Sequence, residues 1–118
     1  MQLDIFEHSR AVILRNAVVD ALKNRSGRAA ASTIAELTAE CGDDSMLPTF
    51  NLLCERLTLR VEAALGPESA AEILRATERA ATAASAVFGR EAEAWLAPFW
   101  VELAAAIRGL SFDPRREV

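Results

Sequence analysis

The amino-acid sequence predicts an all-α protein, and three observations support this fold class. Ala is the commonest residue in an apolar fraction of 52%, and Ala has the highest helix propensity of all residues. Apolar residues recur at the helical period of about 3.6, and no stretch alternates apolar with polar residues convincingly enough to predict a strand. The links between the periodic segments are short and contain Ser, Asp, Gly and Pro, which end helices.

The first two helices are expected over residues 5–24 and 28–41. Asp4 is followed three residues later by Glu7, which is typical of the capping box at the start of a helix. The stretch NRSG then ends the first helix, because Ser and Gly interrupt its apolar stripe. Gly42 suits the position that follows the end of the second helix.

The third helix is expected to begin near Ser45 and to continue to about residue 64. Pro48 falls in its first turn, where the missing N–H of proline costs nothing. Asp43 and Asp44 are interpreted as the polar link and N-cap before this helix. The fourth helix is expected to open at the stretch GPES, with Pro67 early, and to end before Gly89. The fifth helix is expected from about Arg90 to Gly109, and an exit segment or tail over residues 111–118.

Short links place consecutive helices antiparallel to one another. We therefore predict about five antiparallel helices in an up-and-down or hairpin-repeat-like bundle. A chain of 118 residues is long enough to bury one core, so residues 1–110 are predicted to form a single domain.

Both Trp residues of the chain lie in the stretch WLAPFW, which raises the question of what the cluster does. On a helical wheel Trp95, Phe99 and Trp100 fall on one wide stripe, as in a helix packed against two neighbours. We interpret them as a core plug that fills space beside small residues of the fourth helix. The alternative is an aromatic wall of a pocket for a small molecule or lipid. Pro98 would either begin the main part of the fifth helix or bend it.

The sequence offers no set of residues expected to form a catalytic or metal site. One His and two Cys are too few for a zinc site or a di-iron bundle, and motifs that bind phosphate or hold a nucleophile are missing. His8 falls on the polar side of the first helix, and Cys41 and Cys54 are expected to be free thiols. We expect no enzymatic activity and no cofactor.

Arg10 is unusual because it falls on the apolar side of the first helix, one turn from Glu7. Its side chain is expected either to reach the surface along its aliphatic stem or to form a partly buried ion pair with Glu7.

Charge and hydropathy exclude two classes of partner. The formal net charge is −4 with a pI near 5.0, and the basic residues are scattered, which argues against nucleic acid. No apolar run is long enough to span a membrane, and the first residues carry acids rather than a basic and apolar leader. We expect a cytoplasmic protein.

A second apolar stripe favours a role in protein interaction. Val12 and Val19 on the first helix, and Leu52 and Leu59 on the third, lie away from the main apolar faces and are seven residues apart within each pair. They are expected to contact a dimer mate, a partner's amphipathic helix, or the fourth and fifth helices of the same chain. We predict a non-catalytic interaction or scaffolding module of unknown partner, with a symmetric homodimer as one form.

Four stretches of the chain resemble a group of known proteins: MQLDIFEHSRAVILRNAVVDALKNR, LPTFNLL, WLAPFW and GLSFDP. They are similar to the N-terminal part of an uncharacterised group of proteobacterial helical proteins with tetratricopeptide-like helical hairpins. The resemblance spans nearly the whole chain, and its motifs are packing motifs. It implies helical hairpins and a bacterial cytoplasmic setting, and it implies no site residue.

Overall fold

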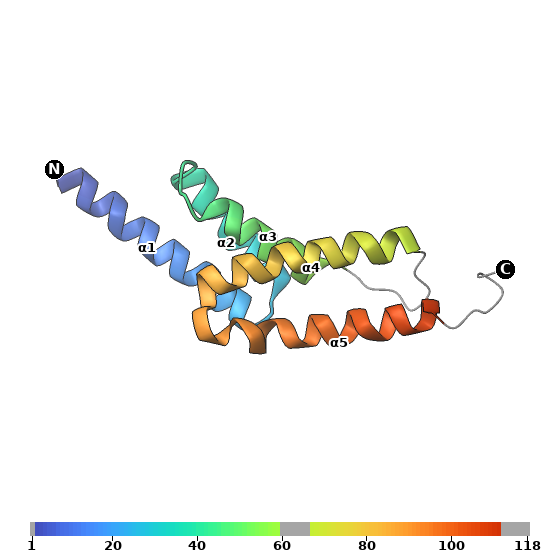
Figure 1. Cartoon of the computed structure of the whole chain (residues 1–118). Helices are drawn as coiled ribbons and strands as arrows, with labels where there is room; N and C mark the ends of the chain where they lie inside the picture. Colours follow the sequence, from blue (N-terminus) through green and yellow to red (C-terminus); the bar gives the residue numbers. More distant parts are fainter. Residues whose placement is uncertain (1, 60–66, 112–118) are drawn as a thin grey trace. The chain divides into compact units, whose positions relative to one another are not determined.

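The computed structural model describes residues 2–59 and 67–111, with side chains for residues 9–59 and 68–106 (Figure 1). These residues form five α-helices and one short 3-10 helix, and no strand occurs among them, so the all-α prediction is confirmed. Their contacts group into two compact units, Met1–Thr58 and Leu59–Val118. The prediction of one domain over residues 1–110 stays a prediction.

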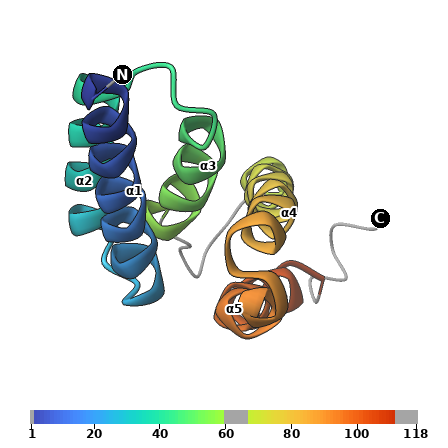
Figure 2. The ribbon, with the colours of Figure 1, turned by 90° about the vertical axis from the view of Figure 1, so that its left-hand side faces the viewer.

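The first unit contains α1 (Gln2–Lys23), α2 (Gly27–Glu40) and α3 (Leu47–Thr58). Helices α1 and α2 lie side by side, and α3 packs on α2 and also touches α1 (Figure 2). The apolar stripe of each helix faces the others, as its period of about 3.6 residues requires. The most deeply buried apolar side chains of this core are Val18, Leu22, Ala30, Leu37, Phe50 and Leu53.

The link between α1 and α2 ends one helix and begins the next within three residues. The N–H of Ser26 donates to the carbonyl of Ala21 at 3.0 Å, and the N–H of Arg25 donates to that of Leu22 at 3.0 Å. This is the Schellman arrangement, in which Arg25 takes the left-handed conformation with φ 59°. The hydroxyl of Ser26 then accepts from the N–H of Ala29 at 3.2 Å and caps α2.

The predicted stop of the first helix is confirmed, but its predicted start is wrong. Helix α1 already includes Gln2, so Asp4 lies within the helix and does not cap it. Gln and Leu, which precede Asp4, favour helix and extend it toward the N-terminus.

Gly27 has a packing role that the sequence pattern did not reveal. It is the first residue of α2 rather than a residue that interrupts a helix. A Cβ atom at this position would lie 2.8 Å from Cγ2 of Thr58, the last residue of α3. The Sγ atom of Cys54 is 3.7 Å from the carbonyl oxygen of Gly27. Only glycine therefore lets the start of α2 approach the end of α3 this closely.

Helix α3 ends at Thr58, several residues before the predicted end near 64. The hydroxyl of Thr58 lies 3.1 and 3.2 Å from the carbonyl oxygens of Cys54 and Glu55, and its one hydrogen is shared between these two acceptors at the helix end. Pro48 lies in the first turn, as predicted. Residues 60–66, where the rest of the predicted helix falls, lie outside the described residues.

The second unit is a pair of antiparallel helices, α4 (Pro67–Phe88) and α5 (Ala92–Ser111), joined by a 3-10 turn at Gly89–Glu91 (Figure 1). Gly89 has φ 56°, a conformation that glycine adopts without strain, so α4 ends where the sequence predicted. Pro98 lies inside α5, which runs through it without interruption. Pro98 therefore does not begin this helix.

We predict that Gly27→Ala lowers the free energy of unfolding by about 1–2 kcal/mol, because the new methyl group overlaps Cγ2 of Thr58. Thr58→Ser removes that atom and keeps the hydroxyl, so it is expected to restore most of the loss when added to Gly27→Ala. Thermal and urea unfolding of the two single variants and the double variant measure the coupling. If the changes in the free energy of unfolding are strictly additive, the two side chains are not in steric conflict.

Candidate interaction surface

The outward side of α5 is apolar along its described length. Val101 is 68% exposed, although Val is a residue that folding normally buries. Five further exposed residues share its side of the helix, within an arc of roughly 120° at about 100° per residue. We call the set the α5 stripe: Ala94, Ala97, Pro98, Val101, Ala104 and Ala105.

Each edge of the α5 stripe carries a carboxylate. Glu93 and Trp100 lie along one edge, seven residues and therefore two turns apart, and Glu102 lies along the other. Trp100 is 38% exposed. No basic residue occurs between positions 91 and 106, and Arg90 and Arg108 stand just outside this range.

The inward side of α5 packs on α4 through aromatic side chains. The ring centroids of Phe88 and Trp95 are 5.1 Å apart, and those of Trp95 and Phe99 are 5.0 Å apart with the rings nearly edge to face. The buried residues of α4 are mainly small, and they leave room for these rings. They include Ala76, Thr77, Ala80, Ala83 and Ala84.

The burial of Trp95 and Phe99 agrees with the predicted plug, but the exposure of Trp100 corrects its placement there. Trp100 is five residues after Trp95, which turns it by roughly 140° on a helix. Because α5 is continuous through Pro98, both Trp side chains cannot point to the same side. Trp100 therefore belongs to the outer surface.

The second apolar stripe predicted on the first and third helices is only partly exposed. Val12 is 37% exposed, and Val19 and Leu52 are half-buried. Leu59 lies beyond the end of α3 and in the second unit, so the spacing from Leu52 is not a helical one. The sequence prediction missed Ile13, which is 58% exposed. Polar residues interrupt the outward side of α1, namely Ser9, Asn16 and Asp20.

Arg10 pairs with a residue of another helix. Its Nε atom lies 3.0 Å from Oε2 of Glu40 at the end of α2, and about half of each side chain is exposed. An exposed pair of this kind contributes little to stability. The side chain of Glu7 lies outside the described ones, so its predicted pairing with Arg10 stays a prediction.

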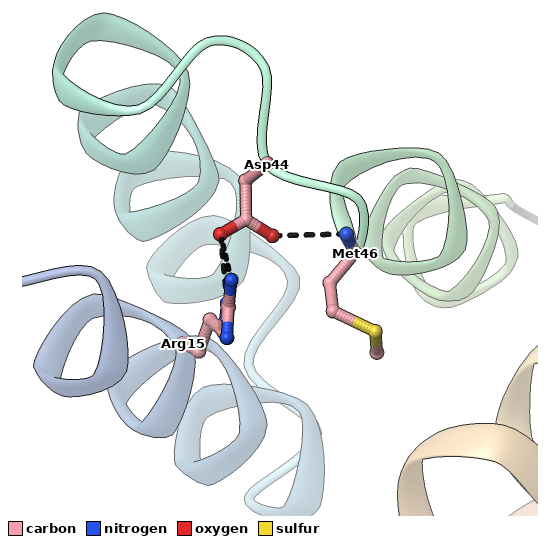
Figure 3. Close-up of polar contacts among 3 residues, drawn as sticks. All are labelled: Arg15, Asp44 and Met46. Atoms are coloured by element: carbon pink, nitrogen blue, oxygen red, sulfur yellow. Dashed lines mark hydrogen bonds and ion pairs between the residues drawn. The ribbon is translucent and has the colours of Figure 1, made fainter. Parts of the chain in front are cut away.

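A buried carboxylate joins α1 to the start of α3 (Figure 3). The Oδ2 atom of Asp44 accepts from Nε of Arg15 at 2.7 Å and lies 2.6 Å from a terminal nitrogen of the same guanidinium group. Its Oδ1 atom accepts from the backbone N–H of Met46 at 2.9 Å. The side chain of Asp44 is 2% exposed and that of Arg15 is 36% exposed.

Asp44 was predicted as part of the link and N-cap of the third helix, and the bond to Met46 agrees with that role. Its pairing with Arg15 was not predicted, because 29 residues separate the two in sequence. Burial by itself raises the pKa of Asp44, but the hydrogen bonds from Arg15 and Met46 and the positive charge of Arg15 outweigh it and lower the pKa below its ordinary value.

The described residues contain no group of side chains that could hold a metal ion. No group of three or more His, Cys, Asp or Glu side chains comes together in the described part of the chain, and the side chain of His8 lies outside it. Cys41 and Cys54 are free, and burial raises the pKa of the Cys54 thiol, which keeps it protonated and unreactive. Within the same residues, no helix is both long and apolar enough to span a bilayer.

Comparisons of the chain with protein-family models, with curated proteins and with solved structures gave no match.

We predict that Asp44→Asn lowers the free energy of unfolding at pH 7 by about 2 kcal/mol, because a buried charge-assisted hydrogen bond is lost. The pKa of Asp44 is lower in the folded state than in the unfolded state. The ionised carboxylate therefore stabilises the fold fully at pH values above its unfolded pKa of about 3.9. This stabilisation is lost as the pH falls through the lower pKa of the folded state. Urea unfolding between about pH 7 and pH 2.5 measures the difference between variant and wild type. Asp43→Asn is the control, because Asp43 is exposed. Equal effects of the two substitutions at pH 7 would contradict the role of Asp44.

The two Trp residues are expected to differ in their contribution to stability. Trp95→Ala leaves a cavity between α4 and α5 and should cost about 3–5 kcal/mol. Trp100→Ala removes an outward side chain and should cost less than about 1 kcal/mol. Thermal unfolding measures the stability of the two variants. The Trp100→Phe variant retains only the buried Trp95, so its fluorescence maximum should lie at a shorter wavelength than that of the wild type. A large loss of stability in Trp100→Ala would show that Trp100 is part of the core.

Proposed function

We propose that this chain is a non-catalytic protein-interaction or scaffolding module that holds a helix of a protein partner on the α5 stripe. The observation that carries the proposal is the exposure of an unbroken apolar face on α5, with Val101 at its centre. A helix that is apolar on both sides is normally buried on both sides. Its outward side therefore suits a second helix better than it suits water.

A small-molecule or lipid pocket is the alternative function, and the aromatic residues support it less well. Trp95 and Phe99 are buried, whereas Trp100 is on the outer surface, so the three do not form one wall. A hollow beside α4 is lined by Arg75, Glu78, Arg79 and Thr82, which are charged or polar. Ligand pockets are mostly apolar with a few polar groups, and this hollow has the opposite character.

Self-association through α1 is a second candidate, because Val12 and Ile13 are exposed there. The predicted homodimer would bury Val12 and Val19 with parts of Leu52 and Leu59. The polar residues between the apolar ones on α1 make this surface less continuous than the α5 stripe. We therefore rank it behind docking on α5.

The helix pairs also support a scaffolding role of the tetratricopeptide-like kind. Helices α1 and α2, and likewise α4 and α5, are neighbours in sequence that pack on each other through a short link. Modules built from helical hairpins present extended surfaces to partner helices. A bacterial cytoplasmic setting remains part of the proposal and rests on the resemblance of the sequence.

A photo-reactive phenylalanine analogue tests the proposal when it replaces Val101, Ile13 or Glu78 in cells that naturally make the protein. Position 101 lies on the α5 stripe, position 13 on α1, and position 78 is an exposed control on α4. After illumination, position 101 should give discrete protein adducts and position 78 none. Adducts from position 13 of twice the chain's mass would identify the homodimer. The absence of adducts at both positions 101 and 13 would contradict an interaction function.

A further inference from the structure

We draw no further inference here: the strongest candidate, the polar hollow beside α4 that Arg75, Glu78, Arg79 and Thr82 line, has all of these residues on one helix, and nothing in the structure shows what covers its open side.

Discussion

The arrangement of the first unit depends on one buried carboxylate. Asp44 binds the guanidinium group of Arg15 on α1 through one oxygen and the N–H of Met46, just before α3, through the other. A side chain that is 2% exposed cannot readily exchange these partners for water. Losing Arg15 would leave an uncompensated charge, and losing the N–H of Met46 would leave a buried oxygen without its donor. The constraint fixes where α3 begins relative to α1, and it lets Gly27 at the start of α2 meet Thr58 at the end of α3.

The second unit depends on a different constraint, which is the regular turn of about 100° per residue along the continuous helix α5. Helix α5 buries Trp95 and Phe99 against the small residues of α4, and the same geometry turns Trp100 and Val101 outward. Ala on the inner side of α4 makes room for rings, and Ala on the outer side of α5 leaves a surface of low relief. One residue type thus makes room for rings in the core in one place and leaves a surface of low relief in another.

These two constraints bear differently on function. The Arg15–Asp44 pair joins parts of the same unit, and both oxygens of the carboxylate accept hydrogen bonds within that unit, so the pair has a structural role. The residues of the α5 stripe are exposed and take no part in the packing of α4 on α5, so a role in interaction suits them better than a structural one. An interaction module needs a surface of this kind and no titratable cluster.

The sequence alone determined the all-α class, the α4 boundaries and the stop after α1, because helix propensity, glycine and capping residues act within a few positions. A run from Ala92 to Ala106 with only two charged residues could also have indicated that α5 is apolar on both sides. Tertiary structure decided the rest. The pairing of Arg15 with Asp44, of Arg10 with Glu40, and the contact of Gly27 with Thr58 join residues about 30 apart, and local patterns carry no information about such distances. Trp100 is exposed because α5 continues without interruption through Pro98. The sequence alone does not reveal this course, because a proline can begin a helix, bend it, or only remove one of its hydrogen bonds.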